Sequence, residues 1–353
     1  MGWLGLRHPI IAAPMAGGPS TPALVAAVSD AGGLGLLAGG YLTASALAEQ
    51  IRAVRSVTAA TFGANIFVPD PAPVDAVALT AYAERLAPEA QRLGATLGAV
   101  TGGDDGWAEK VEVLLAERVP VVSFAFGCPD PSVVAALRAG GATVLITVTT
   151  PREAAAAVGL ADAVVVQGFE AGAHRGGFTD ADGVGEYGVL ALLRLVARVT
   201  AQPLIAAGGI ADGAGIAAAL AAGAVAAQLG TAFLRCPEAG TGDLHRAALG
   251  SATPSTAAET VFTRAFTGRR ARAIANRFLA DHSAAAPAAY PHVHQLTAPL
   301  RAQARARGDA ESLNLWAGQA YPLGTDLPAA QLVQHLGAET RAALADAAAR
   351  LDQ

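Results

Sequence analysis

Short apolar runs alternate with longer, alanine-rich amphipathic stretches over the first two thirds of the chain. The runs have the length and composition of buried parallel strands, whereas the stretches between them begin with helix-start signals such as Thr21-Pro22 and Thr150-Pro151. Eight strands are predicted in this way, at residues 9–13, 34–38, 61–67, 119–126, 143–148, 163–167, 203–207 and 224–229.

The regular alternation of strand and helix, with short connections, predicts a parallel sheet in an α/β protein. A count of eight strands favours closure into a (β/α)8 TIM barrel, and a doubly wound open sheet is the alternative. Residues 241–353 show helices and loops without a strand pattern. We therefore expect a barrel over residues 1–235 and an appended C-terminal helical segment over residues 236–353, packing near the barrel mouth.

Composition and charge exclude several classes of partner. The chain has 353 residues, of which 53% are hydrophobic and 15% charged, so it can bury a large core. A net charge of −5 provides no basic surface for nucleic acid, and no cluster of Lys and Arg suggests an anionic membrane. Arg269, Arg270 and Arg272 stand close together, a spacing typical of a solvated helix face.

Cysteine and histidine spacing predicts neither a disulfide framework nor a metal site. Cys128 and Cys236 are too few for either. His292 and His294 lack a nearby carboxylate or cysteine partner, so a solvated loop is the preferred interpretation. Residues 1–7 lack the features of a signal peptide and no stretch has the pattern of a membrane span, so we expect a cytoplasmic protein.

Glycines and one histidine gather where the sixth predicted strand ends. The stretch QGFEAGAHRGGF, residues 167–178, follows a buried apolar run directly. In parallel α/β proteins this carboxyl end is where chemistry is placed, and glycine lets the backbone approach a ligand closely. His174 titrates near neutrality, which makes it a candidate catalytic residue. A plain glycine-rich turn with a surface histidine is the competing interpretation.

The ends of the last two strands suggest a phosphate site. Gly208 and Gly209 close the seventh strand, and residues 228–231, with the sequence Gln-Leu-Gly-Thr, close the eighth. In (β/α)8 proteins these two loops commonly bind a phosphate, because backbone N–H groups at a helix start point at the anion. The Thr231 hydroxyl can add one hydrogen bond.

Earlier strand ends offer residues for the rest of a cofactor. They are Met15 with its small neighbours, Asn65 and Gln167. An amide side chain can donate and accept at once, which suits the edge of a flavin ring. Together with one phosphate site, this combination indicates FMN.

With these motifs the chain resembles the nitronate monooxygenases, formerly called 2-nitropropane dioxygenases. The resemblance covers most of the chain. It is carried by APMAGGPST at 13–21, NIFVP at 65–69, the stretch at 167–178, AAGGI at 206–210, QLGTAF at 228–233, TGR at 267–269, NRF at 276–278 and WAGQ at 316–319.

The resemblance implies an FMN-dependent (β/α)8 enzyme that oxidises alkyl nitronates with O2 to a carbonyl compound and nitrite or nitrate, without a reduced nicotinamide. It makes His174 the active-site histidine and places Tyr321 in the pocket. The residues that would contact FMN are Met15, Asn65, Gln167, Gly172, Gly208, Gly209, Gln228, Leu229, Gly230 and Thr231.

Two positions depart from the family pattern. Trp107 stands where tyrosine is frequent, and Ala125 is small where a polar residue can occur. We expect Trp107 to line the substrate pocket, and a core residue at a helix start is the alternative. Both departures concern the substrate more than the cofactor or the fold. Two other functions stay open: an NAD(P)H-dependent flavin reductase of the same superfamily, acting on quinones or enoyl groups, and a non-catalytic flavin-binding protein. A homodimer is also left open.

Overall fold

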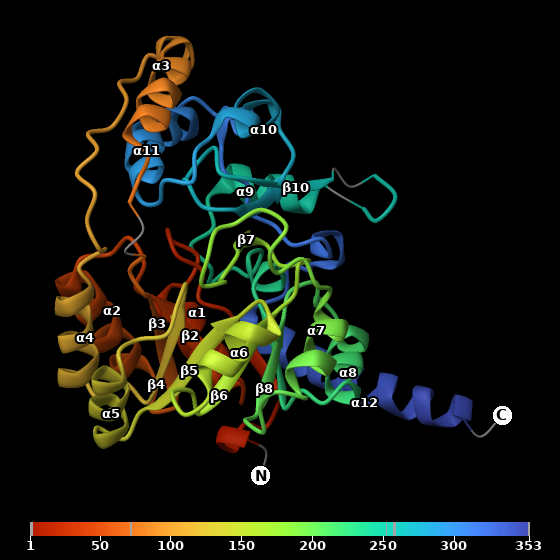
Figure 1. The fold of residues 1–353 in the computed structure, drawn as a ribbon. Helices are drawn as coiled ribbons and strands as arrows, with labels where there is room; N and C mark the ends of the chain where they lie inside the picture. The colour runs from red at the N-terminus through yellow and green to blue at the C-terminus, as the bar shows by residue number, and fades with distance from the viewer. Residues whose placement is uncertain (1–2, 71–72, 252, 257–258, 352–353) are drawn as a thin grey trace.

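The lower half of the molecule is a closed barrel of parallel strands (Figure 1). The structure, a computed structural model, describes residues 3–70, 73–251, 253–256 and 259–351. Pairing of Ile10–Ala12 with Ala226–Leu229 closes the sheet and confirms the barrel over the open alternative. The barrel strands, in spatial order, are β1 (Ile10–Ala12), β2 (Leu34–Ala38), β3 (Phe62–Phe67), β4 (Val121–Ala125), β5 (Thr143–Val148), β6 (Ala163–Gln167), β8 (Leu204–Ala207) and β9 (Ala226–Leu229).

Helices surround the barrel and begin where the sequence signals them. The Thr21 and Thr150 side chains each accept a hydrogen bond from a backbone N–H of the first turn, and proline follows each as the first helical residue. The surrounding helices are α1 (Pro22–Asp30), α2 (Ala44–Val57), α4 (Trp107–Ala116), α5 (Pro131–Ala139), α6 (Pro151–Ala157), α7 (Val189–Val196) and α8 (Gly213–Ala221).

The side chains of each strand point alternately into two hydrophobic cores, one between the barrel and the helices and one inside the barrel. Val164 and Val166 of β6 pack outward against the helices, whereas Ala163 and Val165 fill the barrel interior. The same parity continues to the end of the strand, so Gln167 projects inward at the mouth. The two-residue period of the strand sequence therefore determines which side chains reach the mouth.

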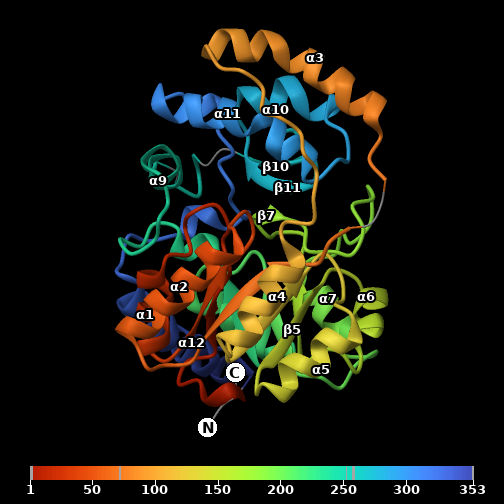
Figure 2. The same ribbon diagram turned by 90° about the vertical axis from the view of Figure 1, so that its left-hand side faces the viewer.

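A second layer covers the mouth of the barrel (Figure 2). It contains α3 (Ala76–Leu93), inserted between β3 and β4, which packs against α11 (His292–Ala306). It also contains α9 (Asp243–Gly250), α10 (Arg277–His282) and a small antiparallel sheet. The strands of that sheet are β10 (Thr260–Thr263), β11 (Ala271–Ile274) and β7 (Ala173–His174).

This sheet corrects the expectation that residues 241–353 contain no strands. The strands β10 and β11 have four residues each, too short for a visible alternation, and β11 finds its second partner in β7, far away in the sequence. Pairing of Ala271 with His174 thus joins the C-terminal part directly to the loop that follows β6.

The arginines of this region are buried, which corrects their interpretation as a solvated helix face. Arg269, Arg270 and Arg272 are at most 6% exposed. Their guanidinium groups donate to backbone carbonyls of the loop after β6: Arg272 binds Phe169 O at 2.8 Å, and Arg270 binds Ala181 O at 2.9 Å. Because each buried cation is satisfied by fixed oxygens, the loop and β11 form one unit.

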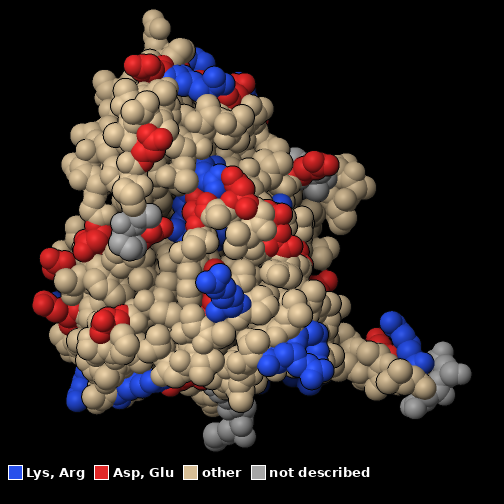
Figure 3. Space-filling model, viewed as in Figure 1, with Lys and Arg blue, Asp and Glu red and all other residues tan. Residues whose placement is uncertain are grey.

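The last helix, α12 (Ala329–Leu351), does not join the second layer. It packs on α8 and α1 beside the barrel, and its C-terminal end projects from the body (Figure 1). The division of the chain at residue 235 stays a prediction about folding units. In the view of Figure 3, acidic and basic side chains lie interspersed on a mostly uncharged surface. Among the described residues, no helix is long and apolar enough to cross a membrane.

Candidate active site

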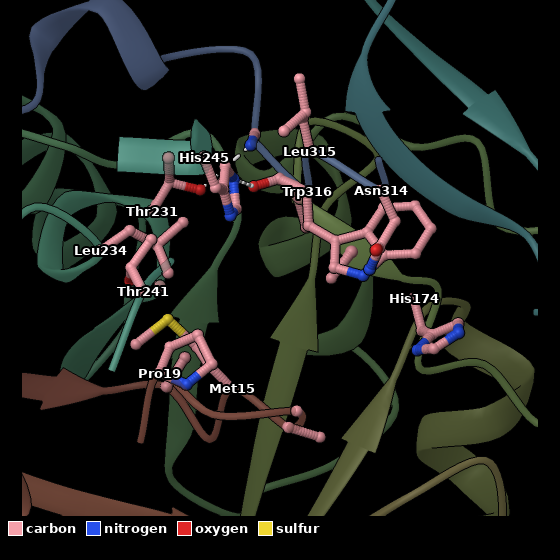
Figure 4. Close-up of a pocket in the computed structure, with 18 of the residues that line it drawn as sticks. Met15, Pro19, His174, Thr231, Leu234, Thr241, His245, Asn314, Leu315 and Trp316 are labelled. Atoms are coloured by element: carbon pink, nitrogen blue, oxygen red, sulfur yellow. Dashed lines mark hydrogen bonds between the residues drawn. The ribbon is translucent and has the colours of Figure 1, made fainter. Parts of the chain in front are cut away.

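A cavity of about 790 Å³ lies between the strand ends and the covering layer. Its size falls within the ~300–1,000 Å³ typical of cofactor and ligand pockets. Figure 4 shows residues from both layers facing it. The barrel contributes the inward-facing residues at the strand ends: Ala13, Asn65, Phe67, Ala125, Thr147, Gln167, Ala207 and Gln228.

His174 lies at one end of this cavity, in a cage of aromatic rings. The ring centroids of Phe126, Tyr290 and Trp316 lie 5.7–5.9 Å from that of the imidazole. Burial, together with the nearby Arg269 guanidinium, lowers the pKa of His174 from 6.5 to about 3. The imidazole is therefore neutral at physiological pH, and it cannot attract an anion by its own charge.

His174 Nε2 lies 2.9 Å from the Thr267 hydroxyl, which itself lies 3.2 Å from the Arg269 carbonyl. The hydroxyl has one proton and can donate it to the carbonyl or to Nε2, so the tautomer of the imidazole decides the direction of this hydrogen bond. In the tautomer that is protonated at Nε2, the imidazole donates to Thr267 and Nδ1 is the acceptor nitrogen.

Gln167 holds the His174 loop in place. Its Oε1 accepts from the Gly176 N–H at 2.8 Å and from Arg175 at 3.1 Å, and its Nε2 donates to the His174 carbonyl at 3.1 Å. The side chain lines the cavity while most of its hydrogen bonds serve this loop. Asn65 likewise donates to Ser123, at 3.0 Å. Cofactor contacts by Asn65 and Gln167 stay predictions.

Three of the glycines assigned to the cofactor are required by the chain itself. A Cβ on Gly172 would lie 2.5 Å from Gly318 N. One on Gly208, whose φ is +100°, would lie 2.9 Å from Ala171 Cβ, and one on Gly209, with φ +70°, would lie 2.8 Å from Glu170 Cβ. These positions pack the strand ends and the segment before Tyr321 against each other.

Gly230 differs, because the space beside it is open. A Cβ there would lie 3.5 Å from Ala13 Cβ and 3.9 Å from Met15 Sδ, which are ordinary contacts. Next to it, Thr231 Oγ1 accepts from Gly318 N–H at 3.0 Å (Figure 4), so the hydroxyl proton remains for another acceptor. Close approach of a ligand gives a reason for glycine here that packing does not.

Gln228 supplies an unsatisfied polar atom in the same region. The residue is 9% exposed, and its Oε1 has no hydrogen-bond partner among the described residues. Such an orphaned acceptor costs free energy unless a ligand or water satisfies it. Leu229 does not line the cavity, because its side chain packs outward in the core, and its cofactor contact stays a prediction. Tyr321 lines the cavity and is 3% exposed.

The structure does not bring Trp107 to the cavity. It is the first residue of α4, and its ring packs on Phe124, an outward-facing residue of β4, with centroids 5.8 Å apart. The loop before Trp107 contacts a cavity-lining residue, because the Asp105 carboxylate accepts a hydrogen bond from the Tyr41 N–H at 3.2 Å. A substrate contact by Trp107 stays a prediction. Ala125 does line the cavity.

Residues that the sequence analysis did not assign to the site complete the wall beside His174. His294 lies on α11 and stacks on Tyr41, with centroids 3.9 Å apart, and Arg301 follows on the same helix. This corrects the solvated loop expected at residues 292–294. Apolar residues at helical spacing, Val293, Leu296 and Leu300, would have signalled a buried helix. Among the described residues, no group of three or more metal-ligating side chains is found.

The covering layer also positions Trp316. His245 Nε2 donates to the Trp316 carbonyl at 2.9 Å (Figure 4), and burial lowers the pKa of His245 to about 4. The Trp316 ring lies over His174 and against Phe266. The motif at 316–319, singled out in the sequence, thus belongs to the wall of the cavity.

Known proteins share this fold. A crystal structure titled as nitroalkane oxidase from Streptomyces ansochromogenes has a TM-score of 0.93 and 49% identity, covering 97% of this chain and 98% of that one. FabK from Thermotoga maritima has a TM-score of 0.75 and 28% identity, covering 98% of this chain and 96% of that one.

Sequence relatives agree. A nitronate monooxygenase from Paraburkholderia phytofirmans is 44% identical, covering 96% of this chain and 93% of that protein. One from Pseudomonas aeruginosa is also 44% identical, covering 96% and 97%. The family described as nitronate monooxygenase matches residues 3–339. The chain belongs to the nitronate monooxygenase family.

Proposed function

We propose that this protein binds FMN in the cavity at the barrel mouth and oxidises alkyl nitronates with O2, giving a carbonyl compound and nitrite or nitrate. The observation that carries the proposal is a neutral, buried His174 facing the same cavity as the open glycine at position 230. Membership of the nitronate monooxygenase family supports it.

The residues present fit FMN. Gly230 and the Thr231 hydroxyl suit the phosphate, because they offer close approach and one unused hydroxyl proton. The orphaned Gln228 Oε1 would gain a donor. The inward-facing residues at the strand ends would hold the flavin ring system. Bound FMN would supply the exchange of electrons between the nitronate and O2.

The chain itself would position the substrate and exclude water. Phe67, Phe126, Tyr290 and Trp316 surround His174, so the reacting carbon would lie in a largely apolar space. The unprotonated nitrogen of the His174 imidazole can accept a hydrogen bond or a proton at its lone pair. A base whose pKa is about 3 removes a carbon-bound proton poorly. We therefore expect the preformed nitronate to be a better substrate than the neutral nitroalkane.

One experiment separates this function from the alternatives. The purified, flavin-loaded protein is mixed without oxygen with a nitronate, NADH or NADPH, and the flavin absorbance is followed. Bleaching or alteration by the nitronate, and by neither nicotinamide, supports the proposal. Bleaching by NADH or NADPH alone would identify a flavin reductase, and no change with any of the three would indicate a non-catalytic flavin-binding protein. The cytoplasmic location and a homodimer stay predictions.

A further inference from the structure

Arg301 is a partly buried cation that lines the cavity. Its Nη2 donates to His294 Nδ1 at 3.2 Å and to the His294 carbonyl at 2.9 Å. Its Nε is buried and has no hydrogen-bond partner, and Nη1 makes no hydrogen bond to any described residue. No carboxylate pairs with Arg301 within the described part of the chain.

The buried arginines of the covering layer differ from Arg301, because their guanidinium groups are hydrogen-bonded by the chain. The Arg175 guanidinium donates to the carbonyls of Gly168 and Gly185, and that of Arg272 donates to those of Phe169 and Thr260. These cations are satisfied by the chain. Arg301 has a free N–H group at Nη1 and lines the cavity, which leaves its unused donors to a ligand.

The surroundings of Arg301 do not neutralise it. His294 and His174 are uncharged, because burial lowers the pKa of each to about 3, and burial raises that of Tyr41 to about 12. Of the described cavity-lining residues, those with a charged side chain are Asp243, Arg301 and Arg305. Of the other two, the Arg305 cation lowers the pKa of Arg301, and Asp243 has no such effect on it.

We propose that Arg301 is the residue that holds the anionic substrate, donating from Nη1 to a nitronate oxygen, while the neutral His174 lines the same cavity without a charge of its own. A nitronate carries its charge mainly on two oxygens in one plane, and a guanidinium N–H group bonds such an oxygen strongly. This inference rests on the proposed function, and it predicts that Arg301 sets the preference for the anion over the neutral nitroalkane.

The test compares Arg301→Gln with Arg301→Lys, and uses Arg198→Gln as the matched control. Arg198 is exposed and does not line the cavity. For Arg301→Gln we expect KM for a preformed nitronate to rise about 10- to 100-fold, the cost of losing a charged hydrogen bond. We expect changes of less than about threefold in the KM for the neutral nitroalkane, in kcat and in flavin content, because none of them depends on a charged hydrogen bond from Arg301. Arg301→Lys should recover part of the loss, because the charge remains.

Binding of nitrite to the holoenzyme provides a readout independent of turnover. Calorimetric titration should show saturable binding to the parent and to Arg198→Gln, and binding about tenfold or more weaker to Arg301→Gln. If the parent oxidises no nitronate but binds nitrite in this Arg301-dependent way, the proposed function fails and the anion site stands. Equal losses for nitronate and neutral nitroalkane, loss of flavin from Arg301→Gln, or nitrite binding that is absent or independent of Arg301 would overturn the inference.

Discussion

Replacing Gly230 by alanine tests the cofactor site with little disturbance of the protein. Gly230 has φ −104° and ψ −71°, a backbone conformation that alanine can adopt. The added Cβ would lie 3.5 Å from its nearest neighbour, Ala13 Cβ. Without flavin, we therefore expect the variant to be as stable as the parent or more stable by up to ~1 kcal/mol, because alanine restricts the unfolded chain.

The substitution should instead weaken the binding of the cofactor. If a phosphate approaches the backbone at Gly230, a methyl group there overlaps it and costs ~1–3 kcal/mol. This corresponds to FMN binding weaker by about 5- to 150-fold. The measurement is fluorescence titration of the apoprotein with FMN, together with the melting temperature of the apoprotein. Gly230→Val should bind more weakly still.

Two glycines serve as controls. Gly242 also lines the cavity, has φ −63°, and would place a Cβ 3.8 Å from Arg305; Gly242→Ala should leave FMN affinity unchanged. Gly172→Ala should lower the melting temperature of the apoprotein, because its Cβ would lie 2.5 Å from the backbone of Gly318. The phosphate assignment is wrong if Gly230→Ala binds FMN within about twofold of the parent.

The remaining predictions concern His174, Thr267 and Trp107. His174→Ala should keep FMN but lose about 10²- to 10⁴-fold in kcat/KM, whereas His174→Asn should keep some nitronate oxidation; a larger loss on the neutral nitroalkane than on the nitronate would identify the histidine as a base, and near-parent values on both forms across pH would remove it from the mechanism. Because the folded-state pKa of His174 is about 3 against an ordinary 6.5, the unfolded chain binds more protons between these values. Stability should therefore rise with pH across this window, with a smaller slope in His174→Asn, as urea unfolding at several pH values would show. Thr267→Val removes the hydrogen-bond partner of His174 Nε2, so NMR should show a changed imidazole tautomer and kinetics a lower kcat/KM at unchanged flavin content, with Thr267→Ser restoring both. Packing of Trp107 on Phe124 predicts that Trp107→Tyr leaves the preference among small and long nitronates unchanged; an altered preference would restore the substrate contact expected from the sequence.

The sequence determined the barrel and the end of it that carries the site. Period-two alternation decides that Gln167 and Gln228 point inward while Leu229 points outward, and the alternation of strand and helix decides the closed parallel sheet. These properties follow from local pattern, because each strand repeats the same rule. The glycine-rich strand ends and His174 could be recognised for the same reason.

Only the tertiary structure decided what surrounds His174. The pairing of β7 with β11 and the hydrogen bond between Thr267 and His174 join segments about 90 or more residues apart. The fold also brings Arg301 to the same cavity. No local sequence pattern specifies these contacts. The state of the histidine depends on these contacts, since burial and neighbouring charges set its pKa. The sequence placed a histidine at the barrel mouth; the packing of the covering layer made it neutral and gave its Nε2 a hydrogen-bond partner in Thr267.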